Sequence, residues 1–111
     1  MIIADEISNK LDDFKTLCQN HSVKYLYAFG SSITDKFNSD LSDIDFLVEI
    51  DDADPIERGE KLISLWDTFE NFFHRKVDLL TESSIKNPFL RKSIDSTKIL
   101  IYDGSEQKVF V

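Results

Sequence analysis

The sequence predicts an α/β (α+β) domain in which about four strands form one sheet and helices cover mainly one of its faces. Short runs of β-branched and aromatic residues alternate with segments of helical periodicity, the pattern of such layered domains. The 111 residues fit a single domain over positions 1–111, and 41% hydrophobic residues are enough for one modest core. Periodicity leaves open whether the sheet is parallel or mixed.

Three segments predict α-helices. The first, from about Asp5 to Asn20, has apolar residues at helical spacing, which are Ile3, Ile7, Leu11, Phe14 and Cys18. The second begins at Asp54-Pro55, a capping residue and a proline at the first helical position, and continues to about Phe73. Its predicted apolar stripe contains Leu62, Trp66, Phe69 and Phe73. The third begins at Asn87-Pro88, runs through Ile94, and is expected to bury Phe89 and Leu90.

Four segments predict strands because they are rich in β-branched, aromatic and aliphatic residues: 23–29, 44–50, 76–80 and 98–102. Gly30 ends the first of them, and Asp103-Gly104 ends the last. The final six or seven residues are expected to be frayed.

The chain is acidic, with 21 Asp and Glu residues against 13 Lys and Arg residues and a formal net charge of −8. This balance argues against direct nucleic-acid binding, which depends on cationic contacts with phosphate. The acidity fits a protein that gathers metal cations or docks on a basic partner, and it also fits simple solubility.

Cys18 is the only cysteine, and its place on an apolar stripe indicates a core residue rather than a nucleophile. A single thiol cannot form an intrachain disulfide. No signal peptide and no membrane-spanning stretch is visible in the sequence, so a cytoplasmic protein without membrane contact is expected.

Asp43 and Asp45 stand two residues apart at a predicted strand, so their side chains point to the same face. Two ionised carboxylates placed together are costly unless a cation neutralises them. Oxygen ligands of this kind suit Mg²⁺ or Mn²⁺, which also take substrate phosphates as ligands. Alone, the Asp-x-Asp pattern fits a solvent-exposed strand face better than a metal site.

Gly30 ends a strand before a short helix of one or two turns within residues 31–37. A glycine lets the backbone approach a phosphate closely, and the helix start offers free N–H groups. The hydroxyl groups of Ser31 and Ser32 can each add a hydrogen bond. The same Gly-Ser pair is also common as a plain turn.

Asp78 shares one face of its short strand with Leu80, opposite Val77 and Leu79. An Asp in the middle of a short apolar strand disfavours strand formation. The position makes sense if this strand lies beside residues 44–50, with Asp78 facing the other two carboxylates. Three carboxylates could hold two cations, the arrangement used in phosphoryl chemistry. The alternative is an edge-strand Asp in water.

Taken together, three motifs resemble the nucleotidyltransferase superfamily related to DNA polymerase β: Phe29-Gly30-Ser31, Ser42-Asp43-Ile44-Asp45 and Val77-Asp78-Leu79. The resemblance is to the minimal nucleotidyltransferase branch, the antitoxin type of HEPN/minimal nucleotidyltransferase pairs. It covers roughly residues 23–104 and implies a mixed sheet. The spacer Ser32–Ser42 is one residue longer than is usual in the family, and the loop Asn38–Leu41 is expected to absorb that residue.

The resemblance implies a role for each motif. The nucleotide's phosphates would be bound by Gly30, Ser31 and Ser32. The ligands of Mg²⁺ or Mn²⁺ would be Asp43, Asp45 and Asp78, and Asp78 would also help to deprotonate the attacking hydroxyl. The implied reaction is in-line attack on the α-phosphate of ATP, which transfers AMP to a hydroxyl of a partner protein. The implied partner is a HEPN-domain toxin, which the modification would silence.

A different class of function is a binding module, in which the same fold acts as a non-catalytic antitoxin that masks its partner. The presence of all three carboxylates favours the enzyme. A phosphatase with Asp43 as nucleophile is disfavoured because the chain lacks supporting Lys and Thr motifs. No second domain is evident to hold the acceptor, so the acceptor surface is expected on another protein or a second copy, in a homo- or hetero-oligomer.

Overall fold

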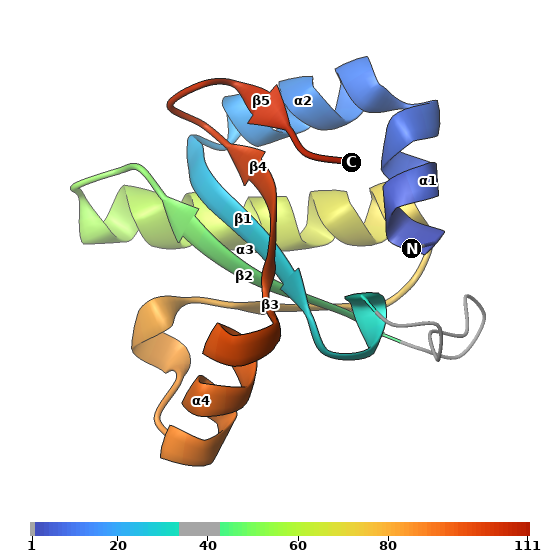
Figure 1. The fold of residues 1–111 in the computed structure, drawn as a ribbon. Coiled ribbons are helices and arrows are strands. Elements are labelled where there is room, and N and C mark those ends of the chain that lie inside the picture. The colour runs from blue at the N-terminus through green and yellow to red at the C-terminus, as the bar shows by residue number, and fades with distance from the viewer. Residues whose placement is uncertain (1, 34–42) are drawn as a thin grey trace.

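The computed structural model describes residues 2–33 and 43–111, which form four α-helices and a five-stranded sheet (Figure 1). The helices are α1 (Ile2–Asn9), α2 (Leu11–Asn20), α3 (Pro55–Phe73) and α4 (Pro88–Thr97), with 3-10 turns η1 (Gly30–Ile33) and η2 (Glu82–Ser84). The strands are β1 (Val23–Phe29), β2 (Ile44–Ile50), β3 (Val77–Leu80), β4 (Ile99–Asp103) and β5 (Lys108–Val109). The predicted fold class is confirmed, with one strand more than expected.

The sheet has the strand order β3-β2-β1-β4-β5. β1 is antiparallel to both of its neighbours, β2 and β4, and β5 is antiparallel to β4. β2 and β3 are parallel, so a crossover has to connect them, and α3 supplies it. The sheet is therefore mixed, as the family resemblance implies, and β3 lies at one edge of the described sheet.

α1, α2 and α3 enclose the main hydrophobic core against one face of the sheet (Figure 1). At its centre the ring of Phe69 lies 5.1 Å from that of Phe46 and 5.9 Å from that of Phe14, measured between centroids. Such separations are typical of favourable aromatic pairs. Cys18 is buried in the same core, and burial raises the pKa of its thiol, so the core interpretation of this cysteine is confirmed.

α3 begins and ends where the sequence predicts. The Asp54 carboxylate accepts a 2.9 Å hydrogen bond from the N–H of Ile56, and His74 ends the helix in the left-handed conformation (φ 53°). The predicted burial of Trp66 is wrong, because Leu65 takes the inward position four residues before Phe69 and leaves Trp66 38% exposed. In the described parts of the chain, no helix is long and apolar enough to cross a membrane.

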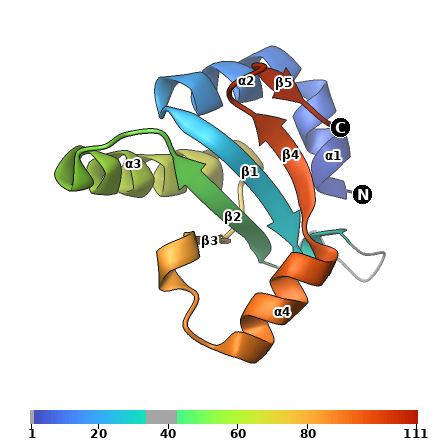
Figure 2. The same ribbon diagram turned by 60° about the vertical axis from the view of Figure 1, so that its left-hand side comes forward.

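α4 packs on the other face of the sheet, through a second, smaller core made of Phe29, Leu47, Ile85 and Ile94. It starts away from the sheet and reaches it at its C-terminal end, where it leads into β4 (Figure 2). The prediction that Phe89 and Leu90 are buried is therefore wrong. They belong to the first turn of α4, and Phe89 is 82% exposed and Leu90 42% exposed.

Two further predictions near the chain ends are wrong. The first helix is divided at Lys10, whose backbone (φ −135°, ψ 46°) leaves the helical region, so Leu11 starts a new helix and is exposed. The C-terminal residues are not frayed, because β5 pairs with β4 through Tyr102 and Val109. Neither the break nor the pairing is marked by Gly or Pro at the position itself.

Replacing Phe69 by Ala should destabilise the fold strongly, because it removes a fully buried ring at the centre of the aromatic cluster. The expected loss in the free energy of unfolding is about 3–5 kcal/mol, measured by urea denaturation. Ile63→Ala is the control, since Ile63 is 71% exposed on the same helix and should change stability by no more than about 0.5 kcal/mol. Equal losses in the two variants would contradict a core centred on Phe69.

Candidate active site

The register between β2 and β3 places Asp45 directly beside Asp78. Paired residues of neighbouring strands point to the same face of a sheet, and here that face is opposite the main core. The preceding pair, Ile44 and Val77, points into the core and is fully buried. The structure therefore brings together two of the predicted carboxylates, which come from segments separated by the whole of α3.

Asp43 immediately precedes β2, and all three predicted carboxylates are half-buried. Burial, followed by repulsion from Asp78 and then from Asp43, raises the pKa of Asp45 from 3.8 to about 6. Like charges disfavour ionisation only when they are close enough to interact. The three predicted acidic residues thus share one electrostatic environment.

Gly30 lies against the carboxylate of Asp45. Its φ of 65° is in the left-handed region, which residues with a Cβ atom rarely adopt. A Cβ atom on Gly30 would stand 2.7 Å from Oδ2 of Asp45, which is too short for a non-bonded contact. The left-handed backbone and the closeness of the Asp45 carboxylate therefore both favour glycine at position 30. The turn at Gly30 borders Asp45 of the carboxylate pair.

Ser32 is completely buried, and its Oγ accepts a 2.8 Å hydrogen bond from the backbone N–H of Asp45. This bond fixes η1 to the residue that carries the central carboxylate. Ser31 belongs to the same 3-10 turn, and phosphate binding by Ser31 and Ser32 stays a prediction. The rest of the predicted short helix, 34–37, and the loop Asn38–Leu41 within the longer spacer lie outside the described residues.

The chemistry of Asp45 and Asp78 fits a hard divalent cation. Carboxylate oxygens are the ligands that Mg²⁺ and Mn²⁺ prefer, and burial together with repulsion from Asp78 and Asp43, which raises the pKa of Asp45, is what a bound cation would offset. Across residues 2–33 and 43–111, no group of three His, Cys, Asp or Glu side chains is already arranged to hold a metal ion. The register places Asp45 and Asp78 side by side, and metal binding by Asp43, Asp45 and Asp78 stays a prediction.

Two residues of α3 contact the strand that carries Asp78. Nε1 of Trp66 donates a 2.6 Å hydrogen bond to the carbonyl of Val77, and the N–H of Val77 donates a 3.0 Å bond to Oε2 of Glu70. Neither contact is evident from the sequence, because Trp on an apolar stripe indicates core and Glu on a helix indicates solvent. The sequence feature that could have indicated these contacts is the spacing of Trp66 and Glu70. They are four residues apart, and so on the same side of a helix that leads directly into an edge strand.

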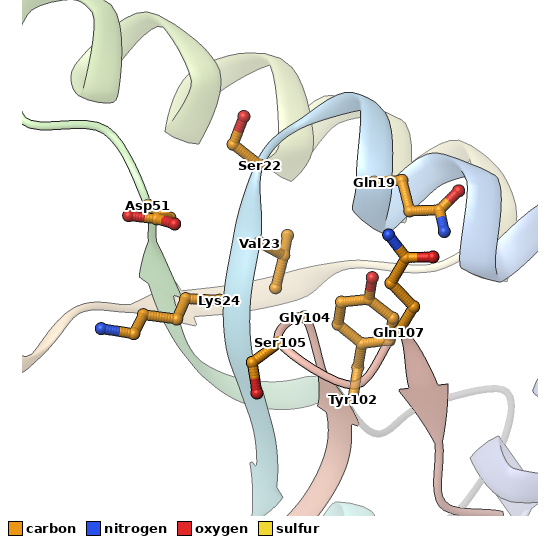
Figure 3. Close-up of a pocket in the computed structure, with 9 residues that line it drawn as sticks. All are labelled: Gln19, Ser22, Val23, Lys24, Asp51, Tyr102, Gly104, Ser105 and Gln107. Carbon is orange, nitrogen blue, oxygen red and sulfur yellow. The ribbon is translucent and has the colours of Figure 1, made fainter.

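A cavity of about 300 Å³ lies at the opposite end of β1 from Asp45 (Figure 3). Its lining includes Val23 and Lys24 of β1, Tyr102 of β4, and Gly104 and Gln107 of the turn that follows. None of the described site residues lines it. The candidate site is therefore identified by side-chain chemistry and strand register, and not by the size of a cavity.

Comparison with known proteins decides the family. The nucleotidyltransferase domain family matches residues 13–101, which is most of the chain. The chain belongs to this family. Two Methanocaldococcus jannaschii relatives are named "Putative protein adenylyltransferase MJ0126" and "Putative protein adenylyltransferase MJ1217". Each is 39% identical to this nucleotidyltransferase over 87 residues, covering 78% of this chain and 85% of the relative. The enzyme class predicted from the sequence is thereby confirmed.

Solved structures share the fold of this nucleotidyltransferase. A toxin–antitoxin structure with AMP-PNP aligns with a TM-score of 0.57 at 23% identity, covering 83% of this chain and 72% of that one. A "putative minimal nucleotidyltransferase" aligns with a TM-score of 0.56 at 22% identity, covering 82% and 92%. A complex of a tri-AMPylated Shewanella oneidensis HEPN toxin with MNT antitoxin aligns with a TM-score of 0.50 at 23% identity, covering 96% and 76%. The resemblance to minimal nucleotidyltransferases is confirmed at the level of the fold.

Replacing Gly30 by Ala should strain the turn and displace the Asp45 carboxylate. The left-handed backbone is expected to cost about 1–2 kcal/mol of stability in urea denaturation, and the shifted carboxylate should weaken Mn²⁺ binding in calorimetry. Gly59→Ala in α3 is the matched control, since an added Cβ meets nothing within 4 Å there and should add about 0.5–1 kcal/mol. Wild-type stability and Mn²⁺ affinity in Gly30→Ala would contradict the close approach.

Replacing Asp45 by Asn should stabilise the metal-free protein at neutral pH. A carboxyl whose pKa rises from 3.8 to about 6 on folding binds its proton more tightly in the folded state. Its ionisation therefore destabilises the fold as pH rises from about 4 to 6. Because Asp45 is partly exposed, the expected gain at pH 7 is discounted to about 1–2 kcal/mol.

Urea denaturation in EDTA at pH 7 and pH 4 measures this effect, with the gain present at pH 7 and nearly absent at pH 4. Asp67→Asn, at an exposed position of α3, is the control and should show no such pH-dependent gain. A gain of the same size at both pH values would mean that charge is not its cause.

Proposed function

We propose that this chain is a metal-dependent protein adenylyltransferase, which transfers AMP from ATP to a hydroxyl of a partner protein as the antitoxin of a HEPN-type toxin. The observation that carries the proposal is the pairing of Asp45 with Asp78 beside the Gly30 turn. The relatives named for protein adenylyl transfer support the reaction, and the fold shared with the antitoxin complexes supports the biological setting. The proposed enzyme is one domain over residues 1–111 and acts in the cytoplasm.

In this proposal the carboxylates of Asp43, Asp45 and Asp78 hold Mg²⁺ or Mn²⁺, which when bound supplies positive charge to the phosphates of ATP. Gly30, which has no side chain, lets the backbone of the turn lie directly beside Asp45, so that the triphosphate can approach this backbone closely. Asp78 accepts the proton of the attacking hydroxyl. The new bond joins that oxygen to the α-phosphorus, the bond from the α-phosphorus to the bridging oxygen breaks, and pyrophosphate leaves.

The acceptor hydroxyl is proposed to come from another protein. The sheet face that carries the carboxylates is covered by α4 near Phe29 and Leu47, where Ile94 packs. Farther along β1 on that face, Tyr25 and Tyr27 remain half-buried. Because α4 covers only part of this sheet face, a partner protein has space to approach the carboxylates. The partner would bring the acceptor hydroxyl to them.

A second candidate is stoichiometric masking of the partner without catalysis. The observation that favours it is that the described residues form no ready-made group of three metal ligands. The repulsion of Asp45 by Asp78 and Asp43, which adds to the effect of burial in raising the pKa of Asp45, weighs against masking alone, because a neutral residue in place of one carboxylate would relieve it. A pure binding module has no physical reason to keep this arrangement.

Replacing Asp43 and Asp45 together with Asn should abolish transfer of AMP and leave the fold and partner binding intact. The substitution preserves side-chain volume but removes the charge that would hold the cation. The test incubates a HEPN-domain protein that binds this chain with ATP, Mg²⁺ and the purified chain, followed by mass spectrometry. The wild type should add the mass of AMP, and the rate with the variant should fall by at least about 10²-fold.

Asp67→Asn serves as the charge control in this assay and should transfer AMP at the wild-type rate. If the wild type adds no AMP and silences the partner as well as the double variant does, masking is the function and the transfer proposal is wrong.

A further inference from the structure

Two side chains of α3 form hydrogen bonds with the backbone of one residue, Val77, at the outer edge of β3. The N–H of Val77 donates to Glu70 (3.0 Å), and the carbonyl of Val77 accepts from the indole N–H of Trp66 (2.6 Å). The carbonyl of Lys76 points the other way and accepts a 3.1 Å bond from the N–H of Ile44 in β2. Successive strand residues direct their backbone groups to alternate sides, so α3 satisfies the outward groups of Val77.

This support matters because β3 is a short strand at the edge of the sheet. It has four residues, and in the described sheet it pairs on one side, with β2. Edge strands expose backbone groups that are otherwise satisfied by water, and such segments open more readily than central ones. Asp78 directly follows Val77, so loss of the bonds at Val77 would loosen the carboxylate that stands beside Asp45.

We propose that Trp66 and Glu70 are positioning residues that hold Asp78 in register with Asp45 for binding of a divalent cation. The proposal rests on the metal site of the proposed function, and it does not depend on which group the enzyme transfers. The two residues are four positions apart, so they project from the same side of α3. The adjacent stripe of the helix, formed by Leu65, Phe69 and Phe73, is buried in the core and fixes the helix that carries the two residues.

The contact of Trp66 is specific to its N–H group. Trp66 is 38% exposed, so its ring is only partly buried, and its N–H group makes the hydrogen bond to the strand. Phe would keep most of the ring and lose the donor. The start of the strand has a separate anchor, since Arg75 forms an ion pair of 2.6 Å with Glu6 of α1. Removing the contacts at Val77 should therefore disturb β3 locally and leave the fold intact.

The test measures the affinity of the full chain for Mn²⁺ alone, by calorimetry, at a temperature where all variants are folded. The double variant Trp66→Phe/Glu70→Ala should bind Mn²⁺ about tenfold more weakly, the usual size of the effect when support of a metal ligand is lost. The amides of Val77–Leu80 should exchange faster with deuterium in the same variant. Glu70→Gln should stay within about twofold of wild type, because its amide oxygen still accepts from Val77.

Two controls separate positioning from charge and from general stability. Glu60→Ala removes an exposed acid from the same helix, and Cys18→Ala removes buried volume in α2; both should keep wild-type Mn²⁺ affinity. Wild-type affinity in the double variant overturns the proposal. So does an equal loss of affinity in Cys18→Ala, or a wild type that does not bind Mn²⁺. A wild type that binds Mn²⁺ and transfers no AMP overturns the proposed function alone.

Discussion

The parallel pairing of β2 with β3 is the constraint on which the rest of the structure depends. It sets Asp45 beside Asp78, and like charges so placed oppose folding. Burial, and after it this repulsion, raises the pKa of Asp45 to about 6. The opposite face of the same strand offsets it, since Phe46 packs there against the ring of Phe69. One face of β2 therefore stabilises the domain, and the other carries unfavourable charge at the candidate site.

α3 links the two faces. Any parallel pair needs a crossover, and here the crossover helix both fills the core and satisfies the outer edge of the strand that it leads into. On the other side of Asp45, the hydroxyl of Ser32 accepts from the backbone N–H of that residue and fixes η1 to β2. The Gly30 turn cannot move independently of the carboxylate that it touches. The site is thus held from two directions by contacts that involve backbone groups.

Features that depend on local pattern could be predicted from the sequence, and features that depend on distant contacts could not. Alternation within 44–50 predicts which side chains enter the core, and the motifs select the acidic residues that the fold gathers at the candidate site. The exposure of Phe89 is not predictable in this way, because it depends on where α4 meets the sheet. The break at Lys10 has no glycine or proline to mark it. The contacts of Ser32 and Glu70 join segments that are separate in sequence, so only the folded chain reveals them.

The charge of the whole chain bears on how a nucleotide could bind. A net charge of −8 offers ATP, which is itself an anion, no general attraction. Burying Asp45 and Asp78 completely would be unfavourable without a cation, so a partly open face suits them and also admits solvent and ions. For the proposed reaction, a cation shared between the phosphates and the carboxylates would offset the repulsion between them. The charges of the protein and of ATP therefore support the proposed metal dependence independently of the sequence motif.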